Sequence, residues 1–300
     1  MLTVLVPATL VSRTAGVWHY GELAISLSWQ LLAAASAATL LAASVRARRV
    51  MVIGLLTVAV HVWTVLSAAV WTRSATDFDG GTRVASINCL SSNVHDDATI
   101  EAIRSTGAHV VGVLELTPRL SRRLRDDLSD QYPHQTLAAS GVSNFGIGLI
   151  SRRPLNKVRR FNLAGGPIAI AAEVDGLNLL FVHPVTPMTA ETFDRRNQQI
   201  TAVADWCVGR PGPTAVLGDF NTTMWSPHVR RMMDRAGLRR AGGWTGLMRP
   251  TWFLGSTVLS SITIDHVLTS DDVLSREVAV GEPFGSDHRS VAVTLAVSTE

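Results

Sequence analysis

Two long apolar stretches near the N-terminus constrain the fold of this chain more than any other feature. Leu23–Val45 has 23 residues without a formal charge, and Val50–Trp71 has 22, with His61 as its only ionisable group. As a helix, each stretch would be about 33 Å long, enough to cross a hydrocarbon core about 30 Å thick. A buried helical hairpin of a water-soluble protein would carry charge on one face. We therefore expect two transmembrane helices.

A short basic turn, Arg46-Ala47-Arg48-Arg49, separates the two stretches and predicts their orientation. Arginines beside the ends of membrane helices favour the cytoplasmic side. The turn should therefore be cytoplasmic, and everything after Trp71 should lie on the outer side of a multi-pass protein of the cell membrane. Residues 1–11 are apolar but too short to span a membrane alone. The sequence leaves open whether they belong to a third span.

Charge is unevenly distributed along the chain, and its balance bears on nucleic-acid binding. Five of the 27 basic residues and one of the 24 acidic residues, Glu22, lie before residue 76, which leaves 22 basic and 23 acidic residues downstream. A strongly basic domain is the usual footprint of a nucleic-acid-binding protein. The near-neutral C-terminal part disfavours nucleic acid as a partner without excluding it. Cys89 and Cys207 are the two cysteines, and we expect them to be unpaired core residues.

The remaining chain predicts a layered α/β domain at residues 83–300, after a polar, glycine-containing linker at 72–82. Apolar runs predict strands at 84–90, 109–116, 146–152, 168–174, 177–184, 214–220, 262–269 and 291–297. Helical patterns cover Thr99–Thr106, Pro118–Leu128, Ala190–Val208 and Pro227–Ala236. Strand–helix–strand units alternate with hairpins, one of which turns at Asp175-Gly176. This mixture predicts a four-layer α/β sandwich, two packed sheets flanked by helices, preceded by the transmembrane helices at residues 1–71.

The strongest local motif is Gly218-Asp219-Phe220-Asn221, which lies between a predicted strand and a predicted helix. Asp219 and Asn221 are two residues apart at the strand end, so their side chains share one face. A carboxylate and an amide placed in this way can orient a water molecule and bind a phosphoryl oxygen. A turn rich in Asp and Asn, without any chemical role, is equally typical of the pattern.

Five further signals place polar residues at the ends of apolar strands or within them. Asp287 and His288 stand together before the last strand, where they can supply a metal ligand and a general base or phosphate-binding group. Asp265 lies inside an apolar run, and a buried carboxylate there needs a partner. Glu115 and His183 end strands, and the first strand contains Asn88. Each residue has an ordinary structural interpretation, but together they predict one crevice lined by polar strand ends.

The order and context of these residues resemble the endonuclease/exonuclease/phosphatase superfamily, which includes DNase I, AP endonucleases, sphingomyelinases and inositol-polyphosphate phosphatases. The resemblance covers about residues 83–297 and rests on the GDFN motif, the later SDH and the ID strand between them. It implies that Glu115, with Asn88 and Asp287, holds Mg²⁺ or Mn²⁺, ions that prefer oxygen ligands. Such an ion polarises the phosphoryl group and offsets charge on the leaving oxygen.

The resemblance also implies roles for the other site residues. His183 and Asn221 would bind the phosphate, Asp219 would orient the attacking water, and Asp265 would orient His288. Either Asp219 or His288 can be the general base, and the sequence does not decide between them.

Two neighbouring positions limit these assignments. Some family members carry an acid two residues after the first asparagine, where this chain has Leu90, so a second metal ligand is not implied there. His266 is adjacent to Asp265 and competes with His288 as the catalytic histidine. Neighbours in a strand face opposite sides, and we therefore expect a structural role for His266.

The layout also resembles membrane-tethered bacterial members of the superfamily, including those linked to glycopeptide (teicoplanin) resistance. This resemblance implies a phosphatase or phosphodiesterase that hydrolyses a phosphate ester or anhydride, with a prenyl pyrophosphate at the outer membrane face as the candidate substrate. No protein partner is implied. Two alternatives stay open: an extracytoplasmic metal-dependent nuclease, and a tethered binding module without activity. Retention of all six signals argues against the binding module.

Overall fold

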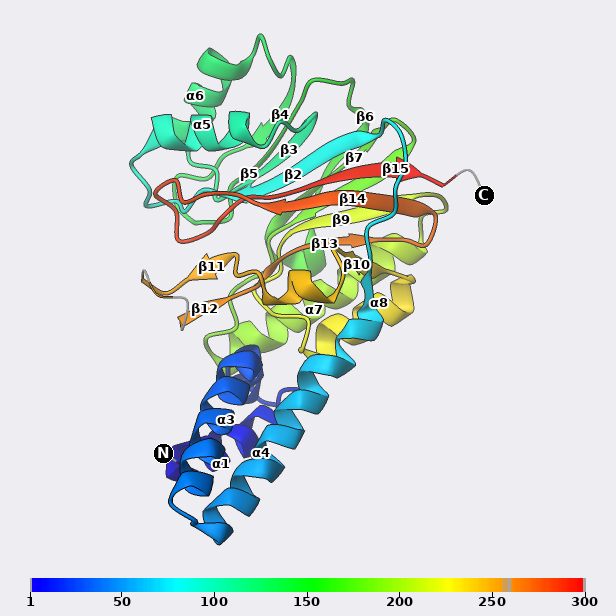
Figure 1. The fold of residues 1–300 in the computed structure, drawn as a ribbon. Helices are drawn as coiled ribbons and strands as arrows, with labels where there is room; N and C mark the ends of the chain where they lie inside the picture. The colour runs from blue at the N-terminus through cyan, green and yellow to red at the C-terminus, as the bar shows by residue number, and fades with distance from the viewer. Residues whose placement is uncertain (1, 256, 258–259, 299–300) are drawn as a thin grey trace.

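The C-terminal part of the chain folds around two packed sheets. The computed structural model describes residues 2–255, 257 and 260–298 (Figure 1). The seven-stranded sheet has the order β1 (Thr72–Arg73), β10 (Arg239–Ala241), β13 (Asp265–Thr269), β9 (Thr214–Asp219), β8 (Leu177–Val182), β7 (Ile168–Val174) and β6 (Asn156–Asn162). The six-stranded sheet has the order β14 (Val273–Val280), β15 (Val291–Val297), β2 (Thr82–Asn88), β3 (Val110–Leu114), β5 (Ile147–Ser151) and β4 (His134–Ala138).

Apolar side chains of both sheets interdigitate in the central core, which includes Leu149, Leu179, Phe181 and Val293. The sheets approach so closely at Gly112 that a Cβ atom there would lie 2.0 Å from the Phe181 ring. Only glycine fits this position, because interiors are packed to crystal density. The central core is therefore fixed by side-chain shape as well as by apolar character.

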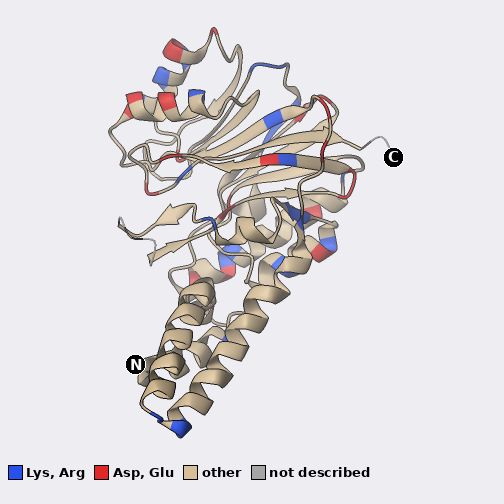
Figure 2. Cartoon of the chain, in the orientation of Figure 1, with Lys and Arg blue, Asp and Glu red and all other residues tan. Residues whose placement is uncertain are grey.

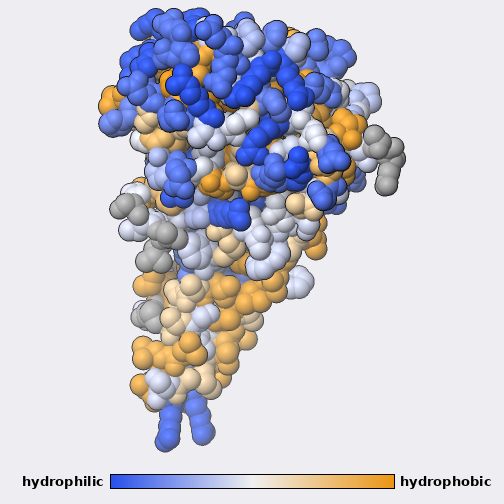
Figure 3. Space-filling view, turned by 45° about the horizontal axis from the view of Figure 1, so that its top comes forward, coloured by the Kyte–Doolittle hydropathy of each residue, from blue (hydrophilic) through white to orange (hydrophobic). Residues whose placement is uncertain are grey.

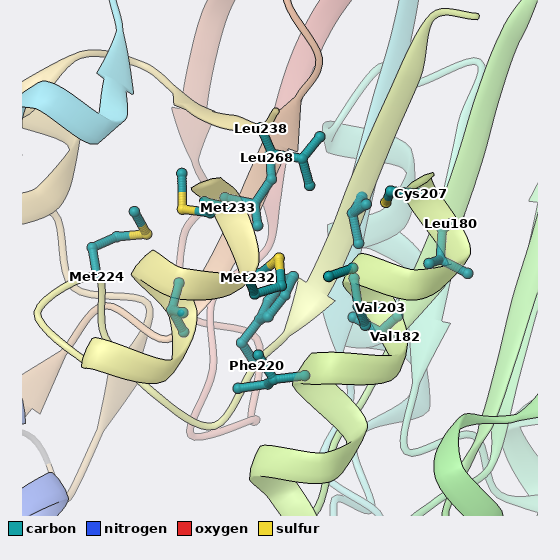
Figure 4. Packing of buried hydrophobic residues seen from close by; sticks show 14 of the residues in the cluster. Leu180, Val182, Val203, Cys207, Phe220, Met224, Met232, Met233, Leu238 and Leu268 are labelled. Carbon is teal, nitrogen blue, oxygen red and sulfur yellow. The ribbon is translucent and has the colours of Figure 1, made fainter. Parts of the chain in front are cut away.

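Helices cover the outer face of each sheet. The helices α5 (Asp96–Ser105) and α6 (Pro118–Leu128) pack on the six-stranded sheet, while α7 (Ala190–Val208) and α8 (Pro227–Ala236) pack on the seven-stranded sheet. Figure 4 shows part of the second contact, where Phe220, Val203 and the α8 methionines meet. The predicted arrangement of two sheets between helices is confirmed. The predicted bounds of α6, α7 and α8 are confirmed as well.

The hairpin predicted at Asp175-Gly176 is also confirmed. It joins β7 and β8 through two residues with φ of 51° and 79°, as a two-residue hairpin turn requires. The expectation for the cysteines holds too, because Cys89 and Cys207 are buried and unpaired.

The strand prediction failed in two ways. Strands β4, β6, β10 and β14 were not predicted. Three of them, β4, β6 and β14, are edge strands, whose exposed side chains do not alternate cleanly. The strand predicted at 262–269 is broken. Its first residue belongs to the hairpin of β11 (Trp252–Phe253) and β12 (Ser261–Ile262), and β13 begins only at Asp265. The Thr251 hydroxyl accepts hydrogen bonds from the backbone N–H groups of Ile264 and Asp265 at this break.

The N-terminal region forms a tapered bundle of four helices below the sheets (Figure 1). These are α1 (Leu2–Ser12), α2 (His19–Ser26), α3 (Ser28–Ser44) and α4 (Arg48–Ser67). Within the described residues, one helix, Arg48–Trp71, is long and apolar enough to cross a membrane. The first predicted span is not a single straight helix. The helices α2 and α3 meet at an angle of 65°, and together they meet the same criterion as one bent span.

Polar side chains are buried inside the bundle beside apolar ones such as Leu5 and Ala38, and large apolar side chains are exposed on its outside. His61 is fully buried, and its Nε2 lies 2.9 Å from the Thr9 hydroxyl, while Arg13 donates to the Thr64 hydroxyl. The exposed large side chains on α3 and α4 include Leu40, Leu41, Val52, Leu56, Trp63 and Leu66. Figure 3 shows this apolar surface tapering to the charged turn, and Figure 2 shows the arginines of that turn at the tip.

The bundle is joined firmly to the layered domain. The first two residues of the predicted linker form β1, which pairs in parallel with β10. Arg230 of α8 donates to the hydroxyl of Ser67, and Gln30 donates to the backbone oxygen of Ser261. Ile25, Val65 and Ala68 of the bundle belong to the same apolar cluster as the inner faces of α7 and α8. The helical bundle is therefore packed against the layer that supports β9.

Candidate active site

The strand topology gathers the predicted site residues at one edge of the two sheets. The parallel pairs β2–β3 and β8–β9 bring the carboxyl ends of four strands together. In the antiparallel partner strand β13, Asp265 is in register with Asp219. The strand β15 runs antiparallel to β2, so His288, just before it, lies near Asn88. The predicted convergence of these residues is therefore what the structure contains.

Asn88 lies at the centre of the group and is fully buried. Its Nδ2 is 3.3 Å from Glu115 Oε1, 3.2 Å from Asp219 Oδ2 and 3.4 Å from His288 Nε2. The amide therefore bridges both sheets. It also accepts a hydrogen bond at Oδ1 from the backbone N–H of Leu90, the position where some family members carry an acid.

Glu115 follows β3 with a left-handed backbone conformation, φ 56°. Such a conformation is uncommon for a residue other than glycine and is often retained at functional sites. Its Oε2 accepts a hydrogen bond from the backbone N–H of Ser91 at 2.8 Å. This bond fixes the carboxylate while Oε1 stays directed toward Asn88.

Asp219 ends β9 and is 1% exposed. Its Oδ1 accepts from the backbone N–H of Asn221 at 2.8 Å, and its Oδ2 lies 3.5 Å from His183 Nε2 and 3.6 Å from His288 Nε2. Burial alone would raise the pKa of Asp219, but the charge of His288 and the hydrogen bond with His183 lower it below its usual value. Asp219 is therefore held as a carboxylate. Asn221 donates from Nδ2 to the backbone oxygen of Pro184.

Asp265 and His288 form a buried pair, with Oδ2 of the acid 2.9 Å from Nδ1 of the imidazole. Burial opposes the charged form of His288, but Asp265 and Asp219 outweigh it and raise the pKa of His288 to about 10. The other oxygen of Asp265 has no hydrogen-bond partner among the described residues. His288 Nε2 thus points toward Asp219 and Asn88 with its orientation set by Asp265.

Two more predicted residues line the same cavity. His183 contacts Asp219 through Nε2 and the ring of Phe145 at 5.4 Å between centroids. Asp287 accepts a hydrogen bond at Oδ2 from Trp252 Nε1 at 2.9 Å, while its buried Oδ1 lacks a partner within the described chain.

His266 faces away from this group, as expected. Its Nε2 lies 2.9 Å from the backbone oxygen of Thr222, and its Nδ1 accepts from Arg240 Nε. Burial and the charge of Arg240 lower its pKa to about 3. His266 is therefore a neutral core residue that supports the turn after Asp219.

The site opens into a cavity of about 480 Å³ with two kinds of wall. The polar floor includes Glu115, His183, Asp219 and His288. The remaining wall is largely apolar and comes from α2, the loop before α7 and the β11–β12 hairpin: Leu23, Leu27, Pro187, Met188, Trp252, Leu254, Ile262 and Ile264. A polar floor and an apolar wall therefore share one cavity.

The donor set fits a divalent cation that prefers oxygen. Glu115, Asp219 and Asp287 supply carboxyl oxygens around His288 in the cavity, and a buried oxygen of Asp287 has no hydrogen-bond partner among the described residues. Ligand atoms of Asp219, Asp265 and His288 lie within 4.8 Å of one another. Glu115 Oε1 lies beside Asn88, and carboxylate and amide oxygens are ligands that a hard cation prefers.

Sequence reasoning missed two contributors to the cavity. Glu22 of α2 lines it, and the only signal for Glu22 was its isolation as an acid in an apolar segment. Trp252 donates a hydrogen bond to Asp287, but nothing in the sequence around Trp252 indicated a place in the site. Its partner in the β11–β12 hairpin, Ile262, follows a loop.

Comparisons with known proteins support the fold. No match was found among the curated proteins. Among solved structures, an endonuclease/exonuclease/phosphatase from Beutenbergia cavernae DSM 12333 has a TM-score of 0.58 at 19% identity and covers 72% of each chain. The D. rerio TDP2 complexed with a single-strand DNA product has a TM-score of 0.60 at 17% identity, covering 73% of this chain and 100% of that one. Sphingomyelinase C from Streptomyces griseocarneus has a TM-score of 0.53 at 14% identity, covering 72% and 99%.

The model of the Endonuclease/Exonuclease/phosphatase family matches residues 85–288, a range that begins within β2 and ends at His288. Enzymes of this family hydrolyse phosphoester bonds, usually with a divalent metal ion, and the prediction that the chain is such a hydrolase is confirmed. The chain belongs to the endonuclease/exonuclease/phosphatase family.

Proposed function

We propose that this protein is a membrane-anchored, divalent-metal-dependent phosphoesterase that acts on a lipid-linked phosphate, such as a prenyl pyrophosphate, at the outer face of the membrane. The observation that carries the proposal is the mixed wall of the catalytic cavity. Leu23 and Leu27 of the apolar N-terminal region face the same cavity as Asp219 and His288. A substrate with a phosphate at one end and a hydrocarbon chain at the other matches both walls.

The exposed apolar surface of the helical bundle supports membrane anchoring. Large apolar side chains such as Leu40 and Leu56 are exposed, whereas the polar His61 and Thr9 are buried and contact each other. Polar groups in membrane helices face the bundle interior in this way. The basic tip lies at the far end from the sheets (Figure 2), so a cytoplasmic tip places the catalytic cavity on the outer side.

Different side chains would bind the metal ion and orient the attacking water. A divalent cation held by Glu115, with Asn88 and Asp287, would polarise the phosphoryl group and offset the charge on the leaving oxygen. Asp219 orients the attacking water, because its carboxylate is kept ionised and fixed by the backbone of Asn221.

Two imidazoles and one amide would bind the phosphate. His288, held by Asp265, is protonated at neutral pH in the metal-free site and donates to a phosphoryl oxygen through Nε2. His183 Nε2 and the second N–H of Asn221 Nδ2 supply further donors.

Substrate panels test the proposal. The detergent-solubilised protein should release phosphate from a prenyl pyrophosphate in Mg²⁺ and not in chelator, and Leu23→Ala with Leu27→Ala should raise KM for that substrate about tenfold. A short water-soluble phosphoester should show no such change. Leu41→Ala, an exposed leucine of α3, is the matched control. Equal KM values for long and short substrates in all variants would exclude a lipid-binding role for the wall.

A nuclease is the second candidate, because two relatives of the same fold are described with DNA: the D. rerio TDP2 with its DNA product and the 3′ phosphatase NExo from Neisseria bound to a DNA hairpin. The near-neutral charge after residue 76 weighs against it. Nicking of plasmid DNA in Mg²⁺, without phosphate release from the prenyl substrate, would establish the nuclease instead. A reporter fused after Glu300 tests the orientation, and a cytoplasmic signal would overturn the proposed topology.

A further inference from the structure

Glu22, the one acid of the N-terminal helical region, is buried at the boundary between that region and the catalytic domain. It is 1% exposed, and its Oε1 accepts hydrogen bonds from Arg196 Nη2 at 2.8 Å and from the Thr222 hydroxyl at 2.7 Å. Arg196 of α7 is fully buried, and among the described residues Glu22 is its only acidic partner. The pair therefore joins α2 to both α7 and the segment after β9.

The contacts of this pair lead directly to the catalytic turn, Asp219–Thr222. Glu22 holds the side chain of Thr222, and Arg196 Nη1 donates to the backbone oxygen of Asn221 at 3.4 Å. The backbone N–H of Asn221 in turn donates to Asp219 Oδ1. Asn221 has a left-handed backbone, φ 51°, a conformation that surrounding contacts must maintain.

A purely structural ion pair would be expected to satisfy both carboxylate oxygens. Glu22 does not, because Oε2 is buried without a partner within the described chain and the residue lines the catalytic cavity. The pair is thus built into the wall of the site and does not simply dock two surfaces. Other contacts, such as the hydrogen bond from Arg230 to the Ser67 hydroxyl, join the helical bundle to the catalytic domain.

We infer that Glu22 is a positioning residue of the active site, which holds the catalytic turn in its reactive geometry through Thr222 and Arg196. The N-terminal region is then part of the catalytic unit as well as an anchor. The inference rests on the proposed hydrolytic function for its kinetic consequence, but the positioning itself can be measured without turnover. Misplacement of a catalytic group by about 1 Å can lower a rate about 100-fold.

The kinetic test uses the full chain in detergent with a prenyl pyrophosphate and Mg²⁺. Glu22→Ala and Glu22→Gln should lower kcat about 10- to 100-fold and change KM by a much smaller factor, since the contacts of His183, His288 and the leucine wall lie outside the displaced turn. Glu22→Asp, which keeps the charge, should recover part of the loss. Thr222→Val keeps the buried ion pair and should lower kcat by a smaller factor. Ser67→Ala, which breaks a docking contact away from the turn, should change kcat less than twofold.

Hydrogen exchange supplies the readout that is independent of activity. The amides of the catalytic turn should exchange faster in Glu22→Ala and Thr222→Val, and at the wild-type rate in Ser67→Ala. Folded Glu22 variants with wild-type kcat and wild-type exchange would overturn the inference while the hydrolase stands. If the wild type releases no phosphate, the proposed function fails. Amide hydrogen exchange at the catalytic turn then tests the positioning role by itself. Faster exchange in Glu22→Ala supports that role, and unchanged exchange rejects it.

Discussion

His288 Nδ1 and Asp265 Oδ2 are 2.9 Å apart, although Asp265 begins a strand of one sheet and His288 precedes a strand of the other. Asp265 begins β13 of the seven-stranded sheet, and His288 precedes β15 of the six-stranded sheet. The pair therefore closes the active site across the central core.

Loss of this contact should impair the chemical step. In Asp265→Asn the amide no longer fixes the His288 ring or stabilises its charge, so kcat for phosphate release should fall roughly 10- to 1000-fold. The thermal midpoint at neutral pH should fall, because the buried charge of His288 loses one of its acidic partners. Asp271→Asn, an exposed acid paired with Arg73, is the control. Wild-type kcat in folded Asp265→Asn would show that the pair does not serve catalysis.

Metal binding should depend on Glu115. Glu115→Gln keeps the acceptor for the Ser91 backbone N–H but loses the negative charge that a hard cation requires. Mn²⁺ binding measured by calorimetry should weaken at least tenfold, and metal-dependent hydrolysis should fall about 100-fold or more. Glu173→Gln, at the exposed ion pair with Lys157, should leave both unchanged. Unaltered Mn²⁺ affinity in Glu115→Gln would move the cation to other ligands.

The backbone before Asp219 should tolerate no side chain. Gly218 has φ 147°, and a Cβ atom there would lie 1.9 Å from the backbone oxygen of Val182 in the neighbouring strand. Gly218→Ala should therefore lower the free energy of unfolding by about 3 kcal/mol or more. Gly237→Ala also faces a left-handed φ, 64°, but has open space around it and should cost only about 1 kcal/mol. Chemical denaturation in detergent measures both, and equal losses would contradict the steric argument.

Stability should fall in acid because His266 is buried in its neutral form. Its pKa is about 3 in the folded protein, against about 6.5 when exposed, through burial and the charge of Arg240. The unfolded chain therefore binds more protons between these values. The free energy of unfolding should decrease as pH falls from about 6.5 toward 3, by up to roughly 5 kcal/mol.

A substitution isolates this contribution. Glutamine can keep both hydrogen bonds of His266, to Thr222 and Arg240, without binding a proton. In His266→Gln the dependence of unfolding free energy on pH should be clearly flatter between 6.5 and 4. An identical slope in the variant and the wild type would assign the acid sensitivity to other groups.

The central strands and the convergence of the candidate residues could be predicted from the sequence because both follow from short-range patterns. Asn88, Glu115, His183 and Asp219 each stand at the end of an apolar run, and parallel strands bring such ends to one edge. The edge strands were not predicted. Strand β6, for example, is exposed along most of its length, and its apolar and polar residues do not alternate. Strands are therefore predicted best from apolar runs where they are buried along their whole length.

Contacts between distant segments could not be predicted. Glu22 and Arg196 are 174 positions apart, and nothing local to either residue indicates its partner. The bend between α2 and α3 escaped for a similar reason, because the apolar run is continuous across Leu27. That bend lets α2 run beside the cavity, so the residues that a straight span would have kept in the bundle reach the active site.

The pairing of β1 with β10 joins the helical bundle to the seven-stranded sheet without a flexible linker. The chain passes from the end of the membrane-length helix into the seven-stranded sheet within one residue step, from Trp71 to Thr72. In the proposed orientation the catalytic cavity sits at a fixed height above the bilayer and cannot swing outward on a flexible stalk. In that orientation, molecules that diffuse within the leaflet would reach the cavity, and solutes far from the membrane surface would not.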